Sequence, residues 1–317
     1  MKEFVIRTGE RSQRLDKYLR RLLPQAAGGF LYKMLRKKNI TLNGSRASGK
    51  ELLAEGDVIR IFFSDETFAK FAEHRAADGE YDALAALPSD VTVVFEDADI
   101  LVLSKPAGML TQKAKETDVS LNEQMLSYLI QNGALSKEQF AVFRPSVMNR
   151  LDYGTSGLVL AAKSLQGAQA LAGQIAGHCM QKEYLCLVHG DFKSAGTAVS
   201  YLIKDEALNR VSLYDEPAEG TVRIETHFAA ERRAGGFTLV HAGLVTGKSH
   251  QIRSQLAKLG HPIVFDRKYG DKGKDRPLRE RFSYEGQLLH AHRVTLADGR
   301  TFLAEPPEIF GAMMELP

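Results

Sequence analysis

The order of the strand-like segments from residue 91 onward constrains the fold of this 317-residue chain most strongly. Short apolar or alternating segments follow one another in runs, and few helical patterns come between them. This order favours an α+β fold over a doubly wound sheet, in which strands and helices alternate. We therefore expect an α+β fold with a mixed, mainly antiparallel sheet. The strand candidates are residues 91–95, 100–103, 158–162, 184–188, 222–226 and 237–240.

Three segments of this region carry helix signals. Ser120 with Glu123 three residues later is a capping-box pattern, which predicts a helix through about Gln131 that ends before Gly133. Residues 165–178 have a helical pattern. A further helix is expected from His250 to Lys258, because a glycine and a proline follow it at 260 and 262.

The first 63 residues differ from the rest in pattern. Within residues 12–23, Leu15, Tyr18, Leu19 and Leu22 fall on one helical face, and residues 31–38 form a second short amphipathic pattern. Residues 40–42 are expected to enter a hairpin, with Asn43-Gly44 as its turn, and residues 58–63 form another strand. Residues 64–89, rich in Ala, Asp and Glu, are interpreted as a linker with helical stretches.

The charge distribution separates the same two parts of the chain. Residues 1–63 contain 14 Lys or Arg and 6 Asp or Glu, whereas the remainder contains 28 basic and 33 acidic residues. A basic head on a mildly acidic body suggests a module that binds a polyanion. The ordinary alternative for such a run of charge is a solvated basic face.

An acidic residue stands at a notable place in the segment 149–157. Asp152 lies between Arg150 and the small residues Thr155-Ser156-Gly157, directly before an apolar segment. A carboxylate on a loop that enters a core strand is held rigidly and can face a cleft, which suits a nucleophile or a base. An Asp that caps a turn beside an Arg would have the same residue types.

Further segments, in order, make the chain similar to a known family. Asn149-Arg150-Leu151-Asp152 with Thr155-Ser156-Gly157 resembles the signature of the pseudouridine synthases that modify large-subunit ribosomal RNA and some tRNAs. The family's other motifs resemble the segments 96–108, 182–190 and 246–253, the last followed by 260–263 and 266–270. The resemblance covers about residues 90 to 310, and residues 90–317 are expected to form the catalytic domain with the pseudouridine synthase fold.

The resemblance implies an enzyme that isomerises uridine to pseudouridine without a cofactor, because the reaction is redox-neutral. Asp152 would be the catalytic carboxylate, which could add to the base or the sugar or deprotonate C2′ of the ribose. Arg253 would keep Asp152 charged, and Tyr184 would pack against the base and take part in proton transfer. From its position on a strand alone, Tyr184 could equally be a core aromatic residue.

RNA contacts are expected in both parts of the chain. Residues 1–63 resemble the S-four-like module, first described in a small-subunit ribosomal protein and shared by tyrosyl-tRNA synthetases. Its helices would place basic side chains against phosphates. Lys105 is expected to contact phosphate, or else to anchor the Lys-Pro-Ala-Gly turn, and Arg150 to contact RNA or position its loop. The full set of predicted RNA-binding residues is Arg14, Lys17, Lys33, Arg36, Lys37, Lys38, Lys105, Arg150 and Lys248.

Three residues depart from the family pattern. Asn149 stands where His is usual, Lys248 where Arg is usual, and Phe265 where Gly is common before Asp266. The first two keep polar or charged character, so activity is expected to be retained, but they leave the identity of the substrate open. Phe265 adds bulk and is expected to reshape a loop near the active-site face.

Alternatives to this interpretation have different products. A non-catalytic RNA-binding or ribosome-assembly factor could share the fold, and a nucleoside hydrolase using Asp152 would release free uracil. The RNA substrate is expected to be ribosomal, with tRNA as the alternative. His290 and His292 would share one face of a strand, but no matching Cys or carboxylate pair accompanies them, so no metal site is predicted.

The remaining expectations come from composition. No apolar run reaches the ~18 residues of a membrane helix, and the N-terminus has no signal-peptide core, so we expect a cytoplasmic protein without a membrane partner. A monomer is the default. Cys179 and Cys186 lack paired spacing and are both expected to be buried or half-buried thiols.

Overall fold

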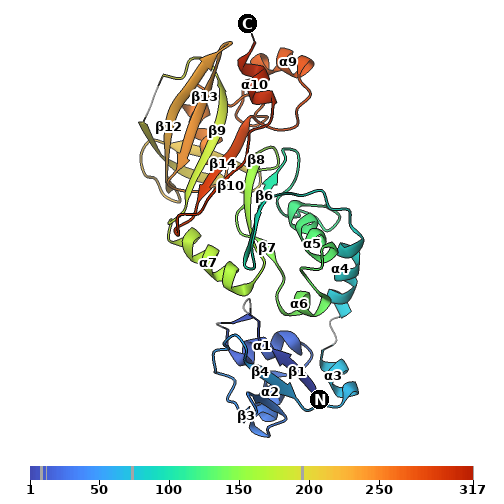
Figure 1. The fold of residues 1–317 in the computed structure, drawn as a ribbon. Helices are drawn as coiled ribbons and strands as arrows, with labels where there is room; N and C mark the ends of the chain where they lie inside the picture. The colour runs from blue at the N-terminus through green and yellow to red at the C-terminus, as the bar shows by residue number, and fades with distance from the viewer. Residues whose placement is uncertain (8–9, 12, 73–74, 194–195, 317) are drawn as a thin grey trace.

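The computed structural model describes the chain except for residues 8–9, 12, 73–74, 194–195 and 317. Two parts of the molecule are visible in Figure 1, a small unit at the N-terminal end and a larger body built on a long sheet. Residue 12 of the first predicted helix and residues 73–74 of the predicted linker lie outside the description. No helix among the described residues has both the length and the apolar character needed to cross a membrane.

The N-terminal unit contains two helices on a small antiparallel sheet. Helices α1 (Leu15–Leu22) and α2 (Gly28–Arg36) pack on strands in the order β1-β4-β2-β3. The predicted apolar face of α1 is confirmed, since Leu15, Tyr18, Leu19 and Leu22 are all buried. The predicted turn at Asn43-Gly44 is also confirmed, because both residues have positive φ between paired strands. The strands are β1 (Lys2–Val5), β2 (Ile40–Leu42), β3 (Ser45–Arg46) and β4 (Val58–Ile61).

Two helices occupy most of the predicted linker, residues 64–89. Helix α3 (Asp65–Phe71) begins after Ser64, whose side chain accepts a hydrogen bond from the Thr67 amide, and its Phe68 and Phe71 pack on the N-terminal core. Helix α4 (Arg75–Ala86) packs on the body, where Leu84 is buried. Each helix therefore extends one of the neighbouring cores, because each has apolar residues that the nearer core can cover.

The body is built on one sheet of eleven strands, with the order β11-β10-β12-β13-β9-β14-β8-β6-β5 and with β7 and β15 attached to β8 and β14. All pairs are antiparallel except β14 with β8, so the mixed, mainly antiparallel sheet is confirmed. The strands are β5 (Thr92–Glu96), β6 (Ile100–Lys105), β7 (Ser146–Val147), β8 (Ser156–Ala162), β9 (Gln181–His189), β10 (Gly196–Asp205), β11 (Arg210–Tyr214), β12 (Val222–Ala234), β13 (Phe237–Leu244), β14 (Leu289–Thr295) and β15 (Thr301–Leu303).

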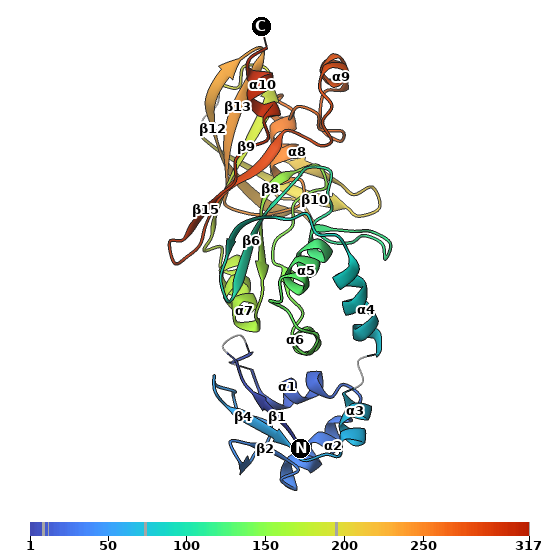
Figure 2. The same cartoon turned by 45° about the vertical axis from the view of Figure 1, so that its right-hand side comes forward.

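Helices cover both faces of this sheet (Figures 1 and 2). Alternate residues of β6 and β8 pack towards α5 (Leu121–Gln131) on one face and towards α7 (Leu165–Ala176) on the other, so β8 is buried along its whole length. Helix α8 (Gln251–Lys258) covers β9 and β13, and α10 (Ile309–Met314) packs on the opposite face of β9. The capping box predicted at Ser120 and Glu123 is present at the start of α5.

Two further helices complete the body. Helix α6 (Lys137–Val142) contacts α1, and its Val142 is buried in the N-terminal core, so the two parts of the molecule share a small apolar contact. Helix α9 (Lys272–Arg281) lies at the other end of the molecule, close to α10 in Figure 1.

The expectation for the cysteines is correct for Cys186, which is buried, and wrong for Cys179, which lies exposed after α7.

Two strands of the sheet approach each other closely at Gly157, the last residue of the Thr-Ser-Gly motif. Its φ is +112°, and a Cβ atom there would lie 2.3 Å from the carbonyl oxygen of Ala291 on β14. Ala291 in turn pairs with Tyr184 on β9. The motif therefore brings three strands together directly beside the loop that precedes β8.

Candidate active site

Asp152 lies on the loop between β7 and β8, and about a third of its side chain is exposed, 30% by area. The loop is fixed on both sides of this residue. The hydroxyl of Thr111 donates to the carbonyl of Leu151 at 2.8 Å and accepts from its amide at 3.1 Å, and the Thr155 amide donates to the carbonyl of Asp152 at 3.0 Å. Asp152 is therefore held on a rigid loop with its carboxylate open to solvent.

Asn149, one of the three departures from the family pattern, fastens this loop to β8. Its Oδ1 accepts a hydrogen bond from the Leu160 amide at 2.7 Å, and its Nδ2 donates to the Leu158 carbonyl at 3.4 Å. At the other end of the loop, Gln287 donates to the Thr155 hydroxyl at 2.7 Å. The Asn149 side chain acts on the loop that carries Asp152 rather than on a substrate.

Of the two roles expected for Lys105, the structure favours the anchor of the turn over the phosphate contact. Its side chain is 1% exposed, and Nζ donates to the carbonyls of Pro106, Met109 and Tyr153 at 2.9, 2.9 and 3.3 Å. Burial lowers the pKa of Lys105 to about 7, although the nearby charge of Asp152 opposes this shift. A buried ammonium that needs all three carbonyls cannot reach a phosphate, so Lys105 anchors the turn and the loop that carries Asp152.

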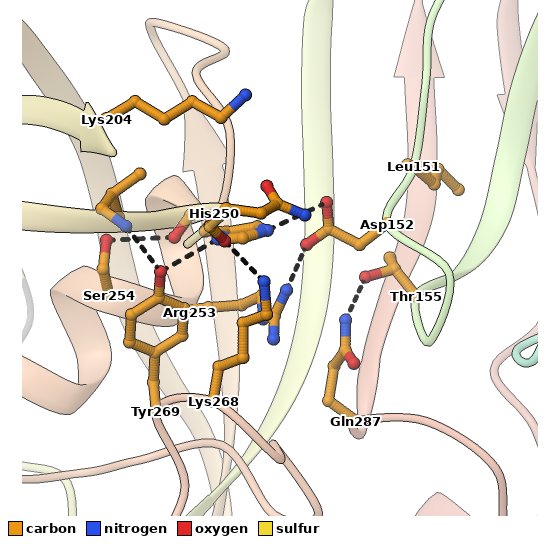
Figure 3. A network of polar contacts seen from close by, with 12 residues as sticks. Leu151, Asp152, Thr155, Lys204, His250, Arg253, Ser254, Lys268, Tyr269 and Gln287 are labelled. Carbon is orange, nitrogen blue, oxygen red and sulfur yellow. Dashed lines mark hydrogen bonds and ion pairs between the residues drawn. The ribbon is translucent and has the colours of Figure 1, made fainter. Parts of the chain in front are cut away.

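Arg253, in the first turn of α8, connects two carboxylates, of which Figure 3 shows that of Asp152. Its Nη1 donates to Oδ2 of Asp152 at 2.6 Å, while Nε and Nη2 donate to the two oxygens of Asp266 at 2.7 and 2.8 Å. Burial alone would lower the pKa of Arg253, but the hydrogen bonds and charges of Asp266 and Asp152 raise it. The guanidinium therefore stays charged and is fixed by Asp266 while it holds one oxygen of Asp152.

His250, to which the sequence assigned no role in the site, faces Asp152. Its Nδ1 lies 2.9 Å from the hydroxyl of Tyr269, and its Nε2 lies 4.0 Å from Oδ1 of Asp152 (Figure 3). The Tyr269 hydroxyl accepts from the Val211 amide at 2.9 Å, which leaves its own proton for Nδ1 of His250. Burial lowers the pKa of His250, so the ring is neutral at neutral pH, and when Tyr269 donates to Nδ1 the ring proton is on Nε2, towards Asp152.

Tyr184 lies on β9, in register with Ala291 and beside the Gly157 approach. Its ring packs between the two apolar clusters that meet there. Burial, and to a smaller degree the charge of Asp152, raises the pKa of Tyr184 above its ordinary value. The phenol is therefore protonated at neutral pH, and it lies close enough to Asp152 to be affected by the carboxylate charge.

The remaining predicted RNA-binding residues lie on the surface, and their role stays a prediction. Arg150 is exposed beside Asp152, and Lys248 is exposed before α8. In the N-terminal unit, Arg14 is half-exposed and paired with Asp16 at 2.8 Å, whereas the others are exposed. The exposed set of that unit is Lys17, Lys33, Arg36, Lys37 and Lys38.

Several residues of the site were not predicted from the sequence, and two of them, His250 and Asp266, had a signal. His250 is the N-cap residue of α8 and precedes Arg253 by three positions, so both residues lie at the start of this helix. Asp266 belongs to a motif segment, and a buried arginine such as Arg253 requires a carboxylate partner. Asp266 was nevertheless assigned no role from the sequence. Thr111 had no comparable signal.

The histidines on β14 are used within the structure. The Nε2 atom of His290 and the Nδ1 atom of His292 lie 2.9 and 2.7 Å from the same carbonyl oxygen of Ala304. The other ring nitrogen of His290 pairs with the Ser156 hydroxyl at 2.9 Å. These contacts tie β14 to β8 and to the segment after β15.

Comparison with known proteins identifies the class of enzyme. Residues 99–258, about half of the chain, match the family model described as RNA pseudouridylate synthase. The chain belongs to the RNA pseudouridylate synthase family, the isomerases that convert uridine in RNA to pseudouridine.

Individual relatives are similar along nearly the whole chain. The ribosomal large subunit pseudouridine synthase C of Escherichia coli K12 is 34% identical over 298 residues, which cover 92% of this chain and 87% of that protein. The protein of the same name from Haemophilus influenzae is 31% identical over 302 residues, covering 93% and 86%. Among solved structures, human RNA pseudouridylate synthase domain containing 4 has a TM-score of 0.56 at 18% identity, covering 76% of this chain and 96% of that one, which supports the fold.

Proposed function

We propose that this protein converts specific uridines of large-subunit ribosomal RNA to pseudouridine, and that Asp152 is its catalytic carboxylate. The choice of RNA is supported by the names of relatives that are similar along about nine tenths of the chain. The choice of Asp152 is supported by the unequal environments of its two oxygens. We also expect a monomer that acts in the cytoplasm, and both statements remain predictions.

The two oxygens of Asp152 have separate roles in this proposal. Oδ2 accepts a short hydrogen bond from Arg253, and the ion pair compensates for the partial burial of the carboxylate charge. Oδ1 has no hydrogen bond within the described part of the chain and faces His250 at 4.0 Å. Oδ1 is therefore the atom available to the substrate, whether it adds to the base or the sugar or removes the proton at C2′.

Arg253 can fix the carboxylate without leaving it during the reaction. Its other donors are engaged by Asp266, whose pKa the hydrogen bonds of Arg253 hold below the usual range although burial would raise it. A guanidinium fixed at its far side cannot swing away, so Asp152 keeps one orientation while the target nucleotide binds and leaves.

Tyr184 contributes its ring and a protonated hydroxyl to the proposed site. Because the pKa of the phenol is raised, Tyr184 is not a phenolate at neutral pH. In any proton transfer from C5 of the isomerised base, the phenol oxygen must therefore lose its own proton in the same step, and Asp152 is the nearby carboxylate that can accept it. The target uridine must leave its stack to reach this pair, which costs a few kcal/mol.

The test is a pseudouridine map of total RNA from cells with and without the gene, read as carbodiimide-dependent stops of reverse transcription. Sites that disappear on deletion should return with the wild-type gene and with Asp90→Asn, an exposed residue with the same change of charge. They should not return with Asp152→Asn, which should lower kcat at least about 1000-fold because an amide cannot act as nucleophile or base.

Different outcomes would overturn different parts of the proposal. Full restoration by a folded Asp152→Asn protein would exclude Asp152 as the catalytic group. Identical maps with and without the expressed protein would favour a binding factor on the same fold, and free uracil in the reaction would indicate hydrolysis. If the sites that disappear on deletion lie only in tRNA, the substrate is tRNA and not large-subunit ribosomal RNA.

A further inference from the structure

We propose that helix α9 and the cleft beside it bind the phosphodiester backbone of the substrate RNA next to the target uridine, an inference that rests on the function proposed above. The cleft, called the α9 cleft below, has a volume of about 620 Å³, within the range of sites that hold small organic ligands. It is lined by Asp266, Arg267, Lys272, Asp275, Arg276, Arg279 and Glu280.

The charge of this segment is opposite to that of the body that carries it. Residues 267–281 contain 7 Lys or Arg and 3 Asp or Glu, whereas residues 64–317 together contain 28 basic and 33 acidic residues. A local excess of positive charge on a mildly acidic body concentrates the potential at one place. A polyanion is the partner that such a surface attracts.

The acidic residues of the α9 cleft are already engaged by the protein itself. Asp266 accepts hydrogen bonds from Arg253 and from the amides of Lys268 and Tyr269. Asp275 is 2% exposed, and its Oδ1 lies 2.8 Å from Nε2 of His189. Only Glu280 remains exposed, at 71% of its side chain, with a weak contact of 3.7 Å to Arg276.

The basic side chains, in contrast, are directed to solvent. Arg276 is 83% exposed, and Lys272 and Arg267 are also exposed and have no ion pair among the described residues. The open face of the α9 cleft therefore presents three cations with few internal partners, which is the arrangement that phosphates require.

The helix that carries these cations is anchored rigidly to the body. The Oδ1 atom of Asp275 accepts from the amide of Phe265 at 3.1 Å, and Nη2 of Arg279 donates to the carbonyl of Phe265 at 2.7 Å. The Arg279 guanidinium also lies 4.7 Å from the centre of the Phe265 ring. Phe265 has a φ of +65°, so these contacts hold a non-glycine residue in a left-handed conformation.

The position of the α9 cleft connects it to the active site. Asp266 forms part of the cleft wall, and the same carboxylate fixes Arg253, which holds Asp152. Arg267 directly follows Asp266 in the sequence, so a phosphate bound to Arg267 would lie beside the segment that carries Asp266. RNA held in the α9 cleft therefore contacts the segment that fixes the catalytic pair, and it can hold the strand that flanks the flipped nucleotide.

The experiment measures initial rates of the full-length protein on protein-free large-subunit ribosomal RNA from the deletion strain, over a range of salt concentrations. The variant is Lys272→Gln with Arg276→Gln, and the matched control is Lys193→Gln with Arg232→Gln, two exposed positions in the loop after β9 and on β12. We expect KM at 150 mM salt to rise about fivefold to tenfold, kcat to stay within about twofold, and the slope of log KM against log salt to fall by about 1.5.

The control variant should behave as wild type, and Lys272→Arg with Arg276→Lys should retain the low KM because it keeps both charges. A wild-type KM and salt slope in the α9 variant, with normal pseudouridine formation, would overturn this inference and leave the proposed function intact. If the α9 variant has a wild-type KM and salt slope but no longer forms a dimer that the wild type forms in sedimentation, the α9 cleft is an interface between two copies of the chain and not an RNA site. If the wild type forms no pseudouridine, the proposed function fails, and RNA binding by filter retention of both variants then decides whether the α9 cleft contacts RNA.

Discussion

At the scale of single residues, the carboxylate of Asp152 is held from two sides that differ in charge. Arg253 supplies a positive charge to Oδ2, whereas His250 presents a neutral ring to Oδ1. A second cation at Oδ1 would stabilise the carboxylate and make it a weaker nucleophile or base. A neutral imidazole, fixed by Tyr269 with its Nε2 atom 4.0 Å from Oδ1, limits the orientation of this oxygen without that effect.

His250→Ala should therefore lower kcat about 10- to 100-fold with KM within about twofold of wild type, because the orientation of Oδ1 is lost while the RNA contacts remain. His250→Gln should recover part of the rate, since an amide can donate from a similar position. Because burial lowers the pKa of His250, protonation of this ring should not reduce wild-type kcat until the pH falls below about 6.5. Single-turnover rates over pH 5.5 to 8.5 test both statements, and a wild-type kcat in His250→Ala would contradict the first.

At the scale of elements, the parallel contact between β8 and β14 supports the catalytic loop. Gly157 permits β8 and β14 to approach closely. His290 on β14 links the two strands by a hydrogen bond to Ser156 on β8, and its other ring nitrogen bonds to the carbonyl of Ala304. Burial lowers the pKa of His290 to about 4. Between pH 6.5 and about 4 the unfolded chain therefore binds more protons at this site than the folded protein, so the stabilisation is present above pH 6.5 and is lost as the pH falls.

From this difference we expect His290 to account for a loss of about 2 kcal/mol in the free energy of unfolding between pH 7.5 and pH 5. Urea unfolding of wild type and His290→Gln at both pH values measures the loss. The variant should be less stable at pH 7.5, but it should lose about 2 kcal/mol less on acidification. His227→Gln, at an exposed position, provides the baseline for the same substitution, and equal losses in wild type and His290→Gln would exclude His290 as the cause.

At the scale of the whole molecule, basic surfaces lie at both ends of an elongated protein, one on the N-terminal unit and one on the body. The exposed lysines and arginines of α2 and the turn after it face solvent in the N-terminal unit, and α9 lies at the opposite end (Figure 1). The N-terminal unit is not independent of the body, because Val142 of α6 is buried in its core. Substitution is therefore a cleaner test of this unit than truncation.

Changing Lys33, Arg36, Lys37 and Lys38 together to Gln should raise KM for ribosomal RNA and reduce its salt slope by about 3, with kcat at saturating RNA unchanged. The reason is that these side chains would contribute phosphate contacts far from the reacting nucleotide. The measurement is the same rate series in salt that tests α9. A fall in kcat with an unchanged KM would contradict a purely binding role.

Local patterns allowed much of the fold to be predicted. The apolar face of α1, the Asn43-Gly44 turn and the capping box of α5 depend on residues a few positions apart, so the sequence displays them directly. The burial of Lys105 and the docking of α3 and α4 were not evident, because each depends on which distant segments cover these residues. The role of Asp266 was missed for the same reason.

The sequence by itself determined the class of fold, the family motifs and the separation of a basic head from an acidic body, since these follow from residue order and composition. Only the tertiary structure decided how the site is assembled. Asp152 and Arg253 are 101 residues apart, and the sheet, where Tyr184, Ala291 and Gly157 meet in register, brings their elements together. Contacts over such separations depend on strand pairing and on the packing of helices against the sheet, which no short stretch of sequence contains.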